Sequence, residues 1–448
     1  MATDLEGLAS RLLEAAAAAG AEAADAVAVA GDSLSIEVRN GALEQADVDP
    51  LGALGLRVLI GQRQACVSSS DIRDATLAAM AERAVAMARE APEDPWCGLA
   101  APEELARDWD LEALDLVDRS VPPTPAALQE AALAAEAAAL AVKGVSKMDG
   151  AGAGWGAGRM HLAASNGFSG GIAWTGQSVQ AVAIVGEGSA MERDHAYEGR
   201  VHRDDMPSPE EIGRRAGERA VARAGASKPP TGAFPVVFDE RVASGLIGHL
   251  VHAINGTAIT RGASWLKDAM GERVLPAGID LLEDPLRPRI AGSRPFDAEG
   301  LPVARRKLVE DGVLMGWTLD LATGRKLGLK STGNASRGTG SPPHPGASNI
   351  ALTEGTVGRD GLLAEMGTGL LVTSLIGASI NPTTGDYSRG ASGFWVENGA
   401  IVRPVNECTI AGNLRAMLAT IRPANDARKH LPAIVPSLLV EGLVIAGA

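Results

Sequence analysis

The sequence predicts an α+β protein. An N-terminal α+β domain over residues 1–230, with helices against an antiparallel sheet, precedes a β-rich C-terminal domain over residues 231–448. Two observations lead to this fold class. Helical and strand-like segments of the first half come in groups rather than in the regular alternation of a βαβ protein. A linker that contains proline and glycine, Ser227–Gly232, then leads into a chain of short apolar runs and glycine turns.

The first sub-region, residues 1–115, is predicted to fold as helix, strands and helix. Leucines at helical spacing predict the first helix, and strict alternation of apolar residues predicts the first strand. The pair Gly61-Gln62 is typical of the turn of a β-hairpin. The second helix carries an apolar stripe of Leu77, Met80, Ala84 and Met87. The predicted elements are helix Leu5–Ala19, strands Ser33–Arg39, Leu56–Ile60 and Ala65–Ser69, and helix Asp71–Ala91.

The second sub-region, residues 116–230, follows a proline-rich, acidic connector. It is predicted to begin with an alanine-rich helix over Pro125–Val142. The glycine-rich segment Gly150–Gly199 predicts an antiparallel meander of short strands. Ser208 as N-cap, followed by a proline at the first helical position, predicts a last helix that runs to about Ala226.

The C-terminal domain is predicted to begin with strand Phe234–Phe238 and helix Asp239–Ile254, which Asn255-Gly256 ends. From Gly278 onward, short strands and glycine turns dominate. The clearest further elements are strands Gly369–Ile376, Gly393–Asn398 and Ala400–Val405, and helix Gly412–Ile421.

Composition argues against several classes of protein. The formal net charge is −14 and no basic stripe occurs, so direct binding of nucleic acid is not expected. The sequence contains no run of about 18 uncharged apolar residues, so no membrane span is expected. The acidic N-terminus does not resemble a signal peptide. The three cysteines, Cys66, Cys97 and Cys408, form no C-x-x-C pair and indicate neither a disulfide framework nor a cysteine-only zinc site. We therefore expect a reduced, cytoplasmic, soluble protein without a membrane partner.

Two histidines, His249 and His252, lie three residues apart on the predicted helix Asp239–Ile254. Side chains at this spacing lie about 60° apart around the helix axis, close enough to share a metal ion. A helical zinc peptidase site also needs a glutamate as general base, and no Glu or Asp stands between these histidines. The alternative is that hydrogen bonds in the core or at an interface satisfy both histidines.

The polar run Asn381–Ser388 is the most unusual polar segment of the chain. Its amide and hydroxyl groups suit a loop that presents hydrogen-bonding groups to a ligand. The same Asn-Pro and Thr-Gly-Asp sequences are also ordinary turn chemistry, so both interpretations remain open.

Other polar segments give weaker signals. Ser331–Asn334 with Arg337, and the run Gly150–Gly154, match neither of the glycine patterns that bind nucleotide phosphates. No G-x-S-x-G sequence indicates a serine hydrolase. Three acids beside proline and glycine are interpreted as solvated loop charges: Asp284, Asp297 and Glu299.

Seven short motifs in a fixed order resemble the TldD/PmbA family, also called peptidase U62 or "modulator of DNA gyrase". Each motif is weak, but their order over more than half of the C-terminal domain is specific. The resemblance is dense over Phe234–Gly447 and looser, though colinear, before it. The motifs begin at Arg261, Phe296, Ser331, Asn381, Gly393, Thr409 and Pro436.

The resemblance implies a cytoplasmic heterodimer of two related subunits around a peptide-sized chamber. In the catalytic TldD branch, H-E-x-x-x-H on a helix and a later cysteine hold zinc. That motif falls on Ile247–His252, where Ile247 and Gly248 replace the first ligand and the base, and only His252 matches. Residues 424–448 contain no cysteine. The chain thus resembles the TldE/PmbA branch, with no catalytic residue, metal or cofactor of its own and zinc expected in a TldD-like partner.

The resemblance therefore implies a non-catalytic subunit that shapes the chamber and docks unfolded peptide substrates. Four residues of the polar run, Asn381, Thr383, Thr384 and Ser388, are predicted to contact peptide. One alternative is a self-sufficient metallohydrolase that uses His249, His252 and a distant acid such as Asp297 or Glu299. Another is a homodimeric binding or scaffold protein with no proteolytic role, and whether the chain forms a homodimer when made alone stays open. The acidic charge gives the gyrase label no support as direct DNA binding.

Overall fold

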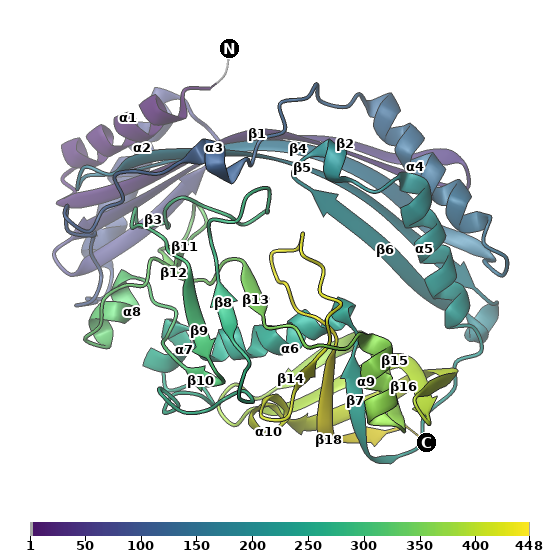
Figure 1. The fold of residues 1–448 in the computed structure, drawn as a ribbon. Coiled ribbons are helices and arrows are strands. Elements are labelled where there is room, and N and C mark those ends of the chain that lie inside the picture. The colour runs from purple at the N-terminus through teal and green to yellow at the C-terminus, as the bar shows by residue number, and fades with distance from the viewer. Residues whose placement is uncertain (1–2, 448) are drawn as a thin grey trace.

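The protein's structure, a computed structural model, describes residues 3–447. Figure 1 shows two parts: a broad curved sheet with helices along its convex side, and a second part, built around a smaller sheet, that faces its concave side. Helices and strands are mixed in both parts, and the predicted α+β fold class is confirmed. No helix within residues 3–447 is long and apolar enough to cross a membrane.

The N-terminal part is a single antiparallel sheet of six strands in the order β3-β2-β1-β4-β5-β6. The predicted hairpin about Gly61 is present between β2 and β3. The central pair, β1 and β4, joins strands from the two predicted sub-regions into one sheet. The strands are β1 Ala23–Arg39, β2 Ala42–Ile60, β3 Arg63–Ser69, β4 Lys147–Ala164, β5 Ser169–Val185 and β6 Glu192–Arg200.

Two pairs of helices cover the convex face, each over its own core (Figure 1). The first pair packs over β1–β3 and the second over β4–β6. Side-chain caps begin three of these helices, and Ser208 accepts a hydrogen bond from the Glu211 N–H as its sequence predicts. The pairs are α1 Leu5–Ala19 with α2 Asp74–Glu90, and α4 Pro125–Leu140 with α5 Pro209–Ala222; the short turns are α3 Leu111–Leu114, η1 Gly188–Ala190 and η2 Arg203–Asp205.

Two predictions about this part were wrong in detail. Met87 does not belong to the buried stripe of α2 but is 47% exposed. The last helix ends at Ala222 rather than near Ala226.

The predicted meander is present, but its strands are long rather than short. Glycine occupies every second position from Gly150 to Gly158, which puts these glycines on one face of β4. The intervening Ala151 and Ala153 face the opposite side and are buried in the core beneath α4 and α5. At Gly158 a Cβ would lie 2.4 Å from the Trp174 ring, so glycine lets that ring lie against the strand. A glycine-rich segment thus forms a strand because its alanines pack on one face.

The C-terminal part contains a six-stranded sheet in the order β16-β15-β14-β7-β18-β17, which an additional pairing of β16 with β18 closes on itself. A four-stranded sheet, β10-β9-β8-β13, and the ribbon β11-β12 lie beside it. The closed sheet consists of β7 Gly232–Phe238, β14 Gly369–Ile380, β15 Asp386–Glu397, β16 Ala400–Asn413, β17 Arg422–Pro423 and β18 Leu438–Ala446. The other strands are β8 Leu281–Glu283, β9 Arg306–Glu310, β10 Val313–Leu314, β11 Ala335–Ser336, β12 His344–Pro345 and β13 Ile350–Leu352.

The helices of this part are mostly short. The predicted helix after β7 is present as α6, Glu240–Ala253, but Asn255 does not simply end it. Its side chain instead caps the next helix, α7, by accepting the N–H of Thr257 at 2.9 Å. The predicted helix Gly412–Ile421 was too long, because β16 continues to Asn413. The remaining helices are α7 Gly256–Thr260, α8 Leu321–Lys326, α9 Arg359–Met366 and α10 Leu414–Leu418.

An aromatic cluster joins the two parts of the molecule. Trp109 from the connector, Phe168 from the β4–β5 turn and Phe296 from the C-terminal part pack together in one core. The Phe296 ring centroid lies 5.0 Å from each of the other two. Gly300 adopts a positive φ of +80°, and a Cβ there would lie 2.5 Å from the Phe168 ring. This close approach fixes the C-terminal segment against the concave side of the sheet.

Candidate functional site

Helix α6 carries both predicted histidines, and its buried and open faces differ sharply. Asp239 caps the helix by accepting the N–H of Arg241 at 3.2 Å. Ile247 is 0% exposed and belongs to the largest hydrophobic core. Gly248 faces open space, since a Cβ there would meet no atom within 4 Å. His252 is exposed on the same side of the helix, and His249 is half-buried at its margin.

Within residues 3–447, no acid contributes to the shifted pKa of His249. Its ring packs edge-on against Tyr387 of β15, with centroids 5.8 Å apart. Nε2 is buried and has no hydrogen-bond partner within the described chain. Burial, followed by the positive charge of Arg389 and the neighbouring His252, lowers the pKa of His249. The imidazole is therefore neutral at pH 7, with a free ring nitrogen.

The two histidines do not meet a third metal ligand. Within residues 3–447, no three side chains of His, Cys, Asp or Glu come together in a group that could hold a metal ion. Asp297 and Glu299, the acids of the metallohydrolase alternative, do not form such a group with His249 and His252. A zinc site in proteins requires at least three protein ligands, so the donor set on α6 does not fit zinc.

The interpretation of Asp297 and Glu299 as solvated loop charges was wrong. Asp297 is 1% exposed and accepts three backbone N–H groups, those of Glu299 and Leu301 at 2.9 Å and Ala335 at 3.0 Å. Glu299 is 8% exposed and accepts the Leu321 N–H at 2.8 Å. Burial, and then the charge of Asp297, raises the pKa of Glu299 to about 8. These acids organise loops between the two parts rather than face solvent.

A buried ion triad lies beside these acids. Asp25 of β1 accepts hydrogen bonds from Arg57 Nε at 2.7 Å and from Arg337 Nη1, and all three side chains are almost fully buried. Burial alone would raise the pKa of Asp25, but Arg57 and Arg337 hold it below its ordinary value. Arg337 therefore pairs with an acid of the N-terminal sheet. Asn334 of the neighbouring segment is likewise occupied, since it donates to Glu283 at 2.7 Å.

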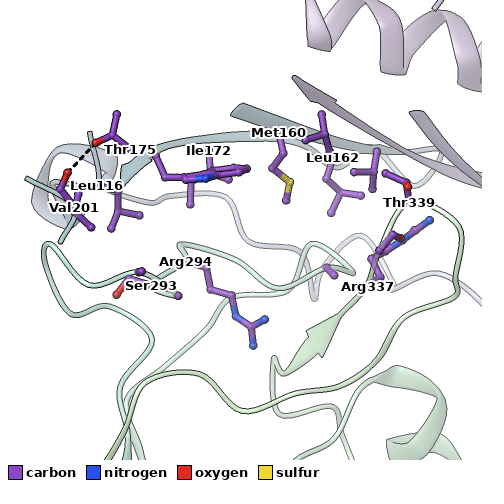
Figure 2. A pocket seen from close by; sticks show the side chains of 17 residues that line it. Leu116, Met160, Leu162, Ile172, Thr175, Val201, Ser293, Arg294, Arg337 and Thr339 are labelled. Atoms are coloured by element: carbon purple, nitrogen blue, oxygen red, sulfur yellow. Dashed lines mark hydrogen bonds between the residues drawn. The ribbon is translucent and has the colours of Figure 1, made fainter. Parts of the chain in front are cut away.

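A cavity of about 530 Å³ lies between the concave face of the N-terminal sheet and loops of the C-terminal part. Figure 2 shows Met160, Leu162 and Ile172 on the sheet side, with Ser293 and Arg294 on the opposite wall. A second cavity of about 490 Å³ shares lining residues with the first, and the glycine face of β4 forms part of its wall. The shared residues are Thr175, Val201 and Ala291. Both volumes fall in the range of small-molecule and peptide side-chain sites.

The polar run Asn381–Ser388 is a tight connection between β14 and β15. Asn381 Oδ1 accepts the N–H groups of Thr383 at 2.9 Å and Thr384 at 3.3 Å. The Thr384 hydroxyl donates to Asp386 at 2.6 Å. The side chains of Asn381 and Thr384 thus close the turn, while Thr383 is exposed and Ser388 is half-buried on β15. Contact of these four residues with peptide stays a prediction.

Comparison with known proteins identifies the family. Models of the PmbA/TldA metallopeptidase match the chain three times: domain 1 over residues 24–88, the central domain over 118–224 and the C-terminal domain over 231–447. Metalloprotease PmbA of Escherichia coli O157:H7 is 36% identical over 415 residues, which cover 92% of this chain and 90% of that protein. The chain belongs to the PmbA/TldD metallopeptidase family. The resemblance predicted from the motifs is confirmed.

Three further proteins are similar to this chain in sequence or in fold. A PmbA homologue of Haemophilus influenzae is 36% identical over 449 residues, covering 99% of this chain and 96% of that protein. The crystal structure of a putative modulator of DNA gyrase from Bacteroides thetaiotaomicron matches with a TM-score of 0.92 and 27% identity over the whole of both chains. TldE of Thermococcus kodakarensis has the same fold, with a TM-score of 0.84 at 20% identity and 98% and 100% coverage.

Proposed function

We propose that this chain is the non-catalytic, TldE/PmbA-type subunit of a heterodimeric, cytoplasmic zinc metallopeptidase that processes unfolded peptides. One observation supports the proposal: α6 is the helix on which the resemblance places the family's zinc motif, and it lacks the first ligand and the base of that motif. Ile247 lies in the core where a first ligand would stand, and Gly248 has no side chain where a base would stand. No third ligand among residues 3–447 stands beside the remaining pair, His249 and His252.

The position of Gly248 supports this assignment of roles. The space beside it is open, so a carboxylate at this position would face away from the core, as a general base must. The helix therefore presents the correct face, and only the reacting groups are absent. Peptide hydrolysis by the assembled pair then depends on zinc, a base and a water that the TldD-like partner supplies.

Peptide docking is the role left for the chain itself. The cavities against the concave sheet offer an apolar wall, and the glycine face of β4 leaves backbone accessible for an extended peptide. Apolar side chains exposed on the outside of the closed sheet suit a permanent subunit contact. They include Ile376, at 75% exposure, and Ile401 and Val402. Permanent interfaces of this kind typically bury upwards of about 2,000 Å².

The test is reconstitution with a catalytic subunit of the same family. Hydrolysis of an unstructured peptide is measured with the chain alone, with the partner alone and with the mixture, and sedimentation reports their association. We expect no hydrolysis by the chain alone, and a mixture that is more active than the partner. A partner whose activity and sedimentation do not change on mixing would refute the proposal.

A further inference from the structure

Arg389 is a cation without a counter-charge on the inner face of the closed sheet. Arg389 lies two residues from Tyr387 and from Ala391 on β15, so the three side chains share one face of the strand. Tyr387 and Ala391 are 3% and 7% exposed and pack in the core beneath α6. Its Nε is buried without a hydrogen-bond partner. Within residues 3–447 its side chain forms no hydrogen bond or ion pair.

Two buried or half-buried arginines of this protein, in contrast, have an acid as partner. Arg57 pairs with Asp25, and Arg306 pairs with Glu283 at 2.8 Å. The Arg389 side chain is half-buried, and only its Nε is withdrawn from water. Because no acid within the described chain pairs with Arg389, its charge is available to an anion from outside that chain.

Two further donors lie beside Arg389 and also lack partners. His249 has its buried Nε2 free, and its ring touches Tyr387. The Tyr387 hydroxyl forms no hydrogen bond within the described residues. Burial raises the pKa of Tyr387 to about 12, so the hydroxyl keeps its proton and can donate it. No acid influences the pKa of either His249 or Tyr387, whereas Arg389 influences both.

The helix beside these groups leaves room for a ligand. A Cβ at Gly245 or Gly248 would meet no atom within 4 Å, so α6 presents bare backbone next to His249. His252 continues the same exposed side. An oxyanion placed over this part of α6 would meet donors from two elements, α6 and β15.

We propose that Arg389, Tyr387 and His249 form a carboxylate-binding subsite for the docked peptide. The guanidinium supplies the charge, and the hydroxyl and the ring N–H supply oriented hydrogen bonds. The carboxylate is the free C-terminus of the peptide or an acidic side chain, and both sources offer the same chemistry. This proposal rests on the proposed peptide-docking function and names the group that the chain recognises.

Fluorescence polarisation on the full-length chain tests the subsite. The first pair of probes is an N-terminally labelled, otherwise neutral pentapeptide, made once as the free acid and once as the C-terminal amide. The second pair is amidated at the C-terminus and carries either glutamate or glutamine at the central position. Because charge-assisted hydrogen bonds are lost, the uncharged member of a pair is expected to bind about ten- to a hundredfold more weakly. The pair that shows the difference identifies the source of the carboxylate.

Two arginine variants give the test its control. Arg389→Gln is expected to bind both members of the discriminating pair alike. Arg83→Gln removes the same charge from an exposed arginine of α2 and is expected to keep the discrimination. Arg389→Gln is also expected to melt no lower than the unchanged protein, because it removes an uncompensated charge rather than a native contact.

The outcomes separate the subsite from the docking function. If peptides bind but neither pair discriminates, or if discrimination survives Arg389→Gln, the subsite is refuted while docking stands. If no peptide binds the unchanged chain, both proposals fall. A melting temperature lowered by more than about 5 °C in Arg389→Gln would show that an acid within the folded assembly pairs with Arg389, and would also refute the subsite.

Discussion

Replacement of Glu299 by glutamine is expected to stabilise the protein, and to do so more strongly as pH rises. The pKa of Glu299 is raised to about 8 in the folded protein, first by burial and then by Asp297, against an ordinary value of 4.5. Between these two values the unfolded chain releases the proton and the folded chain keeps it. The folded state therefore binds more protons than the unfolded state, and stability falls as pH rises from about 4.5 to about 8.

The size of the effect follows from the two pKa values. Each unit of difference corresponds to about 1.4 kcal/mol, so the full difference sets a ceiling of about 5 kcal/mol, which is reached above pH 8. Glutamine cannot ionise and thus lacks this penalty at every pH. Its amide oxygen can still accept the Leu321 N–H that Glu299 accepts at 2.8 Å. The variant is expected to gain about 2–5 kcal/mol over the unchanged protein at pH 8.5, and much less at pH 5.

Urea unfolding at pH 5, 7 and 8.5 measures this difference. The matched control is Glu103→Gln, which removes the same charge from an exposed position of the connector and is expected to give no pH-dependent gain. A stability difference for Glu299→Gln that is constant over this range, or that shrinks as pH rises, would refute the assignment of a buried, protonated Glu299.

Two other substitutions test the packing described above. Asp25→Ala leaves Arg57 and Arg337 buried without their acid and is expected to lower the free energy of unfolding in urea by about 3–5 kcal/mol. The control Asp32→Ala changes an exposed residue of the same strand and is expected to lower it by less than about 0.5 kcal/mol. Equal effects of the two variants would contradict the buried triad. Gly248→Ala is expected to stabilise α6 by up to about 1 kcal/mol, because the space beside Gly248 is open. Gly158→Ala is expected to lower the stability by about 1–3 kcal/mol, because the new methyl group would clash with the Trp174 ring. A loss of stability in Gly248→Ala would show that another group covers this face of α6.

Local signals in the sequence predicted much of the fold. Ser208 and its following proline marked the start of α5, and the hairpin about Gly61 followed from its turn residues. Strand lengths were missed where glycine hides the alternation, as over Gly150–Gly158 of β4, where Ala151 and Ala153 are buried in the core beneath α4 and α5. Propensity alone does not register a strand whose stabilisation comes from α4 and α5 across the sheet.

The chemistry of long-range contacts could not be predicted from spacing. Asp25 and Arg337 are 312 residues apart in the chain, and nothing local to either indicates their pairing. Asp297 and Glu299 look like loop acids, and only the fold brings the N–H groups of Ala335 and Leu321 to them. The sequence singled out the histidines of α6 and the polar run that contains Tyr387, but not the contact between the His249 and Tyr387 rings, which forms only where β15 packs beneath α6.

The most direct test of the proposed division of labour is peptide hydrolysis by the assembled pair when this chain carries His252→Ala, with zinc measured in the purified chain. His252 is exposed on α6 and has no third ligand beside it. If the partner supplies the metal, kcat/KM is expected to stay within about twofold of the unchanged pair, and the chain alone is expected to hold far less than one zinc. A loss of more than about a hundredfold, together with about one zinc per unchanged chain that His252→Ala releases, would show that this chain performs the hydrolysis itself.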